Sequence, residues 1–226
     1  MNKLWKILIT FGVAMLLSAV FLCVYNFHES NVAYENSQTA LSGLKILIPD
    51  IPDIPENPED TYVEHLYEIQ ENAKRDVLAE SEERLKESES YEPEMTSVEL
   101  DGRYYCGYIT LETIGLELPV LNNWSYANLN IAPCRYEGTP ETHDLIIAAH
   151  NYNSHFGMIK NLSDDDEIVF TDCLGQKYHY IVTHMEYIDG YSVEQMSENN
   201  SEWDLTLFTC TLNGQSRVTI RAKLEE

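Results

Sequence analysis

The chain has 226 residues, 44% of them apolar, and a formal net charge of -24 at pH 7. This length suits one or two domains, and the apolar content is enough for one ordinary core. The charge excludes binding to nucleic acid through its phosphates and disfavours electrostatic adhesion to anionic lipid, so any attachment to a membrane must be hydrophobic.

An uncharged apolar run occupies residues 7–25. As a helix rising about 1.5 Å per residue, it approaches the roughly 30 Å hydrocarbon thickness of a bilayer. Two lysines precede the run and two glutamates come after it, at Lys3, Lys6, Glu29 and Glu35. The positive-inside rule therefore predicts residues 1–6 in the cytoplasm, a single span of the cell membrane and the remainder outside. The alternative is a cleaved signal peptide, but no small-x-small cleavage site lies after the run.

Residues 26–100 are acidic and differ in composition from the C-terminal part of the chain. Proline at every third position from 49 to 55 favours polyproline II and a semi-rigid spacer. A capping-box pattern at Thr61 and Glu64, with apolar residues at helical spacing after it, predicts a helix over 61–86. We interpret this region as a linker between the membrane span and a domain at 101–226.

From Val98 onward, short alternating or apolar segments separated by turn signals predict an all-β barrel or sandwich. Short helical turns are expected near 156–162 and 193–198, and Leu174-Gly175 is expected to turn one hairpin. The expected strands are 104–110, 117–121, 145–149, 167–172, 177–187, 205–209 and 217–224.

The last two of these strands bring a thiol and a cation together. Asn213-Gly214 between them tolerates positive φ and predicts a turn, so Cys210 closes one strand and Arg217 opens the next. A thiol attacks as thiolate, which a nearby cation favours, and a guanidinium suits the oxyanion formed in acyl transfer. The alternative is a small buried Cys and an unrelated surface Arg.

A histidine supplies the third group. His150 is the first polar residue after the apolar run 145–149, at a strand end where catalytic side chains commonly emerge. Of the other histidines, only His155, in the next loop, is a serious competitor.

The segment Thr206 to Cys210, TLFTC, resembles the TLxTC signature of the sortase family, the Gram-positive cell-surface cysteine transpeptidases. Ala149-His150-Asn151 lies upstream and Arg217 downstream, as in that family. The similarity runs from about Cys106 to the end and includes Gly107–Ile109, Ile114–Leu116, Leu118–Val120 and Tyr136–Thr139. The subclass is left open between class B-like and class D-like members, and no Asp-Pro-aromatic triplet of a pilin-type lid is found.

The resemblance implies an eight-stranded sortase barrel. It also implies that Cys210 attacks an LPxTG-like sorting signal of a secreted protein while His150 protonates the leaving amine and Arg217 positions the carbonyl. Thr209 is a supporting motif residue beside the nucleophile. An amine from peptidoglycan or a pilin would then take the acyl group from the thioester. The alternatives from other classes are a cysteine peptidase without transfer and a non-catalytic surface scaffold.

No cofactor is expected. The run Asp164-Asp165-Asp166-Glu167 resembles the acidic loops through which some sortases bind calcium, but it lacks alternating ligand positions and is interpreted as a solvated turn. Cys106 and Cys134 are candidates for a disulfide, and separate buried thiols fit them equally well.

Overall fold

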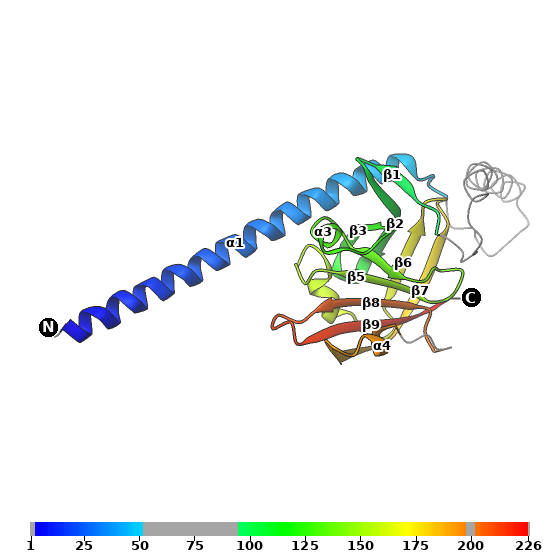
Figure 1. The fold of residues 1–226 in the computed structure, drawn as a ribbon. Coiled ribbons are helices and arrows are strands. Elements are labelled where there is room, and N and C mark those ends of the chain that lie inside the picture. Colours follow the sequence, from blue (N-terminus) through cyan, green and yellow to red (C-terminus); the bar gives the residue numbers. More distant parts are fainter. Residues whose placement is uncertain (1–2, 52–94, 198–201, 226) are drawn as a thin grey trace, which may run out of the picture.

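The computed structural model describes residues 3–51, 95–197 and 202–225. A β-barrel carries one long helix, α1 (Lys3–Leu47), whose N-terminal half extends away from it (Figure 1). The helix predicted over 61–86 and most of the proline-rich spacer lie outside the described residues.

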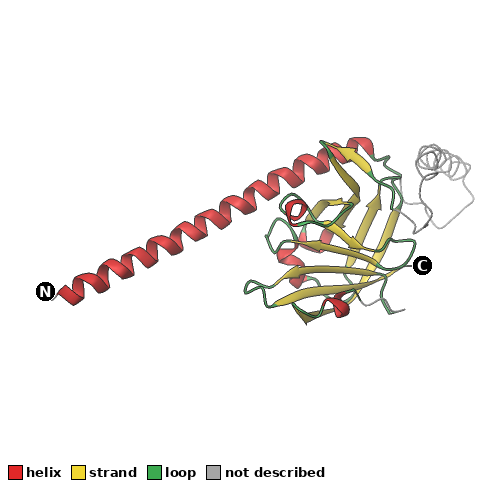
Figure 2. Cartoon of the chain, in the orientation of Figure 1, coloured by secondary structure: helices red, strands yellow, loops and turns green. Residues whose placement is uncertain are grey.

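The barrel is closed by backbone pairing. Its sheet has the strand order β1-β2-β3-β4-β5-β8-β9-β7-β6, and a further pairing joins β2 to β6. Strands β2 to β9 thus form the predicted eight-stranded barrel, with β1 added outside the ring on β2 (Figure 2). The strands are β1 (Val98–Leu100), β2 (Arg103–Leu111), β3 (Leu116–Leu121), β4 (Cys134–Glu137), β5 (Leu145–Ala149), β6 (Glu167–Asp172), β7 (Lys177–Asp189), β8 (Leu205–Cys210) and β9 (Ser216–Leu224).

Short helices fill several connections: η2 (Glu112–Ile114), α3 (Tyr126–Leu129), η3 (Phe156–Asn161) and α4 (Val193–Met196). The expected turns near 156–162 and 193–198 correspond to η3 and α4, and the turn at 174–175 joins β6 to β7. All the expected strands are present. The sequence did not predict β1 or β4, because their alternation of apolar and polar residues extends over only three and four residues.

The apolar run of β5 contributes side chains to the inside and to the outside of the barrel. In β5, Leu145 and Ile147 belong to the interior core, whereas Ile146 and Ala148 belong to a second cluster. That second cluster also contains Leu44 of α1, so the helix covers part of the outer surface. Strand β5 is therefore apolar throughout because both of its faces are buried.

Helix α1 is longer than the predicted span and continues without interruption into the region that we expected to be a linker. Its apolar part has a mean hydropathy of 2.7 over 18 residues, none of them buried. From Ala33 onward, one side packs on the barrel, and Lys45 pairs with Glu117 of β3 at 2.6 Å. No proline precedes Pro49, so nothing of that kind kinks the helix between its exposed and packed parts. The buried positions of this part are Ala33, Ser37, Ala40, Leu41, Leu44 and Ile48.

The closing pair β2–β6 depends on a glycine. Gly107 has φ 148°, and a Cβ there would lie 2.0 Å from the carbonyl oxygen of Thr171. Only glycine permits so close an approach of the two strands.

Candidate active site

Three neighbouring strands place the predicted residues together at one rim of the barrel. Strand β5 runs parallel to β8 with Ala149 opposite Thr209, so His150, the next residue, comes beside Cys210. Strand β8 runs antiparallel to β9, and Cys210 pairs directly with Arg217. Since neighbouring strands lie about 4.8 Å apart, the backbone register alone brings the three positions together.

The alternation of side chains shows which face these residues occupy. On β8, Leu207 belongs to the interior core and Phe208 to the outer cluster, so Cys210 lies on the outer face. Arg217 lies on the same face because its neighbour Val218 is interior. Both side chains are partly exposed. The thiol and the guanidinium are therefore accessible from outside the barrel rather than enclosed within it.

His150 is partly exposed, and the residue before it, Ala149, belongs to the interior core. Its Nε2 lies 3.1 Å from Oδ1 of Asn130, which ends α3. The ring of Tyr152 lies 5.0 Å away, centroid to centroid. Partial burial lowers the pKa of His150, which favours the neutral imidazole. The sequence analysis missed Asn130, because no local pattern marks a residue that acts across a loop connection.

The competing histidine occupies a different environment. The side chain of His155 is completely buried, and neither ring nitrogen has a hydrogen-bond partner among the described residues. Burial, with a smaller contribution from the charge of His150, lowers the pKa of His155 to about 4. His150 thus lies at the rim, whereas His155 is buried beside the backbone of Ala33 in α1.

The turn after Cys210 fixes the candidate arginine. Thr211 N donates to the carbonyl of Ser216 at 2.9 Å, and Gly214 has φ 70°, as expected for the Asn213-Gly214 turn. Arg217 Nη1 donates to the carbonyls of Gly214 and Ser216 at 3.1 and 3.2 Å. Within the described part of the chain, its Nε and Nη2 have no such partner and can meet a carbonyl oxygen of a bound peptide.

Thr209 joins the two strands that carry the candidate thiol and imidazole. Its Oγ1 donates to the carbonyl of Ala149 at 2.8 Å, and the residue is buried. The bond lies one position before both His150 and Cys210. Thr209 therefore supports their spacing and does not itself face a substrate.

Comparisons with known proteins address the identity of this barrel. The family model for the sortase domain matches residues 109–225, more than half of the chain. The chain belongs to the sortase family. Its members are cysteine transpeptidases, so this sortase is an enzyme of that class. No curated protein sequence matches it.

Solved sortase structures share this fold. A Clostridium perfringens sortase D5 transpeptidase is 22% identical with TM-score 0.52, over 69% of this chain and 95% of that one. Sortase C1 from Streptococcus agalactiae is 19% identical with TM-score 0.51, over 72% and 91%. Sortase C1 of GBS Pilus Island 1 is 16% identical with TM-score 0.55, over 84% and 92%. At such identities the likeness concerns the fold alone.

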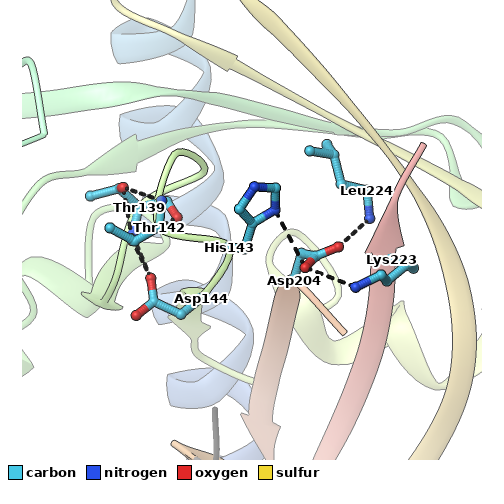
Figure 3. Close-up of polar contacts among 7 residues, drawn as sticks. All are labelled: Thr139, Thr142, His143, Asp144, Asp204, Lys223 and Leu224. Carbon is cyan, nitrogen blue, oxygen red and sulfur yellow. Dashed lines mark hydrogen bonds and ion pairs between the residues drawn. The ribbon is translucent and has the colours of Figure 1, made fainter. Parts of the chain in front are cut away.

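The opposite ends of β5 and β8 in this sortase are closed by polar contacts (Figure 3). The buried carboxylate of Asp204 accepts hydrogen bonds from Lys223 Nζ at 3.1 Å and from the backbone N–H of Leu224 at 2.8 Å. His143 Nδ1 lies 3.4 Å from the same carboxylate. These contacts join the start of β8 to the end of β9. A hollow of about 200 Å³ adjoins them, well away from Cys210.

A buried arginine on the outer face of β9 also organises this sortase. Arg221 is 1% exposed, and its Nη1 donates to Thr206 Oγ1 at 2.7 Å. Its Nε donates to Glu186 at 2.9 Å, and its guanidinium lies 4.3 Å from the centre of the Trp203 ring. Arg221 faces outward from the barrel, since its neighbours Ile220 and Ala222 belong to the interior core, but Gln195, Met196 and Trp203 cover it.

The residues considered for calcium binding and for a disulfide have structural roles instead. Asp166 accepts hydrogen bonds from Thr113 Oγ1 at 2.9 Å and from Ser163 N at 2.7 Å, so it stabilises a turn. No group of His, Cys, Asp and Glu residues suited to a metal occurs in the described ranges. Cys106 and Cys134 are separate buried thiols, and burial raises the pKa of Cys134 to about 12.

Proposed function

We propose that this sortase cleaves LPxTG-like sorting signals of secreted proteins with Cys210, His150 and Arg217, and transfers the acyl product to an amine of the cell wall or a pilin. The observation that carries the proposal is the register of β5, β8 and β9, which brings the three residues to one rim and one face. Family membership supplies the reaction class.

In the first half-reaction, the Cys210 thiolate attacks the carbonyl carbon of the scissile peptide bond and a C–S bond forms. Arg217 stabilises the negative charge that develops on the carbonyl oxygen. As the C–N bond breaks, the His150 imidazolium gives its proton to the leaving amine. The products are a thioester on Cys210 and a neutral His150.

In the second half-reaction, an acceptor amine attacks the thioester carbon and forms a new amide bond. His150 takes the proton that the amine loses, and the C–S bond breaks to regenerate the Cys210 thiolate. Because burial lowers the pKa of His150, keeping the imidazolium needs a stabilising contact. The neighbouring thiolate and the Oδ1 of Asn130 can supply it.

We also infer that residues 7–25 span the cell membrane, with residues 1–6 in the cytoplasm and the barrel outside. The apolar part of α1 supports this topology by length, by composition and by its exposure. The family is one of cell-surface enzymes.

The test uses the full chain in lipid vesicles with a panel of LPxTG-like peptides, with and without an amine, and identifies the products by mass. We expect cleavage, an amide product only when amine is present, and loss of both in Cys210→Ala. The matched control is Cys23→Ala, which removes an exposed thiol on α1 and should keep full activity.

The same experiment separates the alternatives. A peptidase would release the hydrolysed acid at the same rate with or without amine. A scaffold would bind a peptide without cutting it, and Cys210→Ala would change nothing. Equal loss in the Cys210→Ala and Cys23→Ala variants would contradict the assignment of Cys210.

A further inference from the structure

Two adjoining turns near Cys210 carry the most exposed large apolar side chains of the described barrel. Leu212 in the β8–β9 turn is 95% exposed, and Tyr191 after β7 is 94% exposed. The turns are bonded to each other, since Gly190 N donates to the carbonyl of Gln215 at 2.8 Å. Single exposed apolar residues are ordinary, but two of them on joined turns form an apolar tip.

Helix α1 relates this tip to the membrane. The β8–β9 turn projects from the barrel toward the side where the N-terminal half of α1 extends (Figures 1 and 2). The barrel first touches α1 close to the apolar run, where Ser154 Oγ donates to the carbonyl of Ser30 at 3.3 Å. Ser30 lies only ~8 Å along the helix axis beyond Tyr25, the last residue of that run. The barrel is therefore held at a short and fixed height above the apolar segment.

The β8–β9 turn of the tip carries no charge. The chain has a net charge of -24, yet the turn from Thr211 to Ser216 has no charged residue, and the acidic residues of the tip, Asp189 and Glu194, belong to the turn of Tyr191. A leucine and a tyrosine are the residue types that enter the boundary between lipid headgroups and acyl chains.

We propose that the β8–β9 and β7–α4 turns rest on the lipid bilayer, with Leu212 in the apolar boundary and Tyr191 at the headgroups. The proposal rests on the proposed function only in taking residues 7–25 as the membrane span. Cys210 precedes Leu212 by two residues, about 7 Å of extended chain, so its thiol lies close to the membrane surface. The tip then holds Cys210 at a fixed height above the bilayer, which affects only substrates that are tethered to the same bilayer.

The first test measures contact with lipid and does not depend on activity. Full-length Leu212→Trp and Ile46→Trp variants are placed in phosphatidylcholine vesicles with and without brominated acyl chains, and the quenching of the natural tryptophans is subtracted. Ile46 is the matched control because it is 84% exposed at the opposite end of α1. We expect added quenching for Leu212→Trp alone. Equal quenching in the two variants, or none in Leu212→Trp, overturns the proposal.

The second test uses Leu212→Asp and its control Ile46→Asp. Each is given one peptide substrate free in solution and the same sequence joined by a short linker to an apolar span in the vesicle. Leu212→Asp should lose about tenfold more activity on the tethered substrate than on the free one, the cost of withdrawing one leucine from an apolar contact. Equal losses on both substrates overturn the proposal. If the wild type cuts neither substrate, the proposed function fails, while the quenching still decides the contact with lipid.

Discussion

The two ends of strands β5, β8 and β9 differ in how completely their polar groups are bonded. At one end, the buried carboxylate of Asp204 meets Lys223, the backbone of Leu224 and His143. At the other end, Cys210 is partly exposed, and Asn130 holds the imidazole of His150 by one contact. One end fixes the register of the strands, and the register brings Cys210, His150 and Arg217 together at the other end, where their side chains are partly exposed.

The largest effect on stability is expected from replacing Arg221, which is buried outside the barrel core. Replacing Arg221 by Met keeps the aliphatic volume but leaves Thr206 and the covering backbone carbonyls without their buried cation. We expect a loss of about 3–5 kcal/mol in the free energy of unfolding, as when one partner of a buried polar network is removed. Denaturant titration measures it. The control is Arg103→Met at an exposed position of β2, and losses of equal size in the two variants would contradict the assigned role of Arg221.

Below the reactive rim, His155 should make stability depend on pH. Its folded pKa of about 4 lies below the unfolded value of 6.5, so the folded state prefers the neutral ring. The resulting stability is complete above pH 6.5 and is lost as the pH falls toward 4, by about 3 kcal/mol. In His155→Leu this loss of stability should vanish, while any loss caused by protonation of carboxylates at low pH remains. Parallel curves of unfolding free energy against pH for the two proteins would rule the explanation out.

The sequence predicted that His150, Cys210 and Arg217 come together at strand ends, because local signals determine their placement. The apolar run before His150, the turn at Asn213-Gly214 and the alternation around Cys210 are each legible within a few residues. Pairing of β5 with β8 is then expected from the fold that the family resemblance implied. The roles of His150, Cys210 and Arg217 in the reaction remain a proposal.

The features that the sequence did not reveal depend on contacts between distant segments. Arg221 lies on the outer face of β9, and contacts with a distant part of the chain bury it, namely the carbonyls of Gln195 and Met196 and the ring of Trp203. The extension of α1 beyond Tyr25 did have a signal, since Ala33, Ser37 and Ala40 recur at helical spacing. Because these side chains are small or polar, their spacing is a weak sequence signal for a helix face that packs on the barrel.

A smaller effect on stability is expected from Asp204→Asn, which keeps the shape of the side chain but removes its charge. The amide offers one acceptor oxygen where the carboxylate serves both Lys223 and the backbone N–H of Leu224. We expect the free energy of unfolding to fall by about 2 kcal/mol, typical for hydrogen bonds to a charged group, with little change in turnover by the molecules that stay folded. Asp164→Asn, at an exposed turn, is the control. A loss of turnover larger than the loss of folded protein would mean that the two ends of the strands are coupled.

The smallest expected effect concerns Asn130. Its Oδ1 accepts a hydrogen bond from His150 Nε2–H, which both the imidazolium and one neutral tautomer carry. The imidazolium donates the stronger, charge-assisted bond, so this contact favours the protonated form that the leaving amine needs. Removing one such bond in Asn130→Ala should lower kcat/KM about fivefold and move the limb of the pH–rate profile that reports the titration of His150 to lower pH, with thermal stability unchanged. Asn130→Asp should move that limb to higher pH, because a carboxylate stabilises the imidazolium more than an amide does. A purely structural Asn130 would instead lower stability in both variants and leave the position of the limb where it is in the wild type.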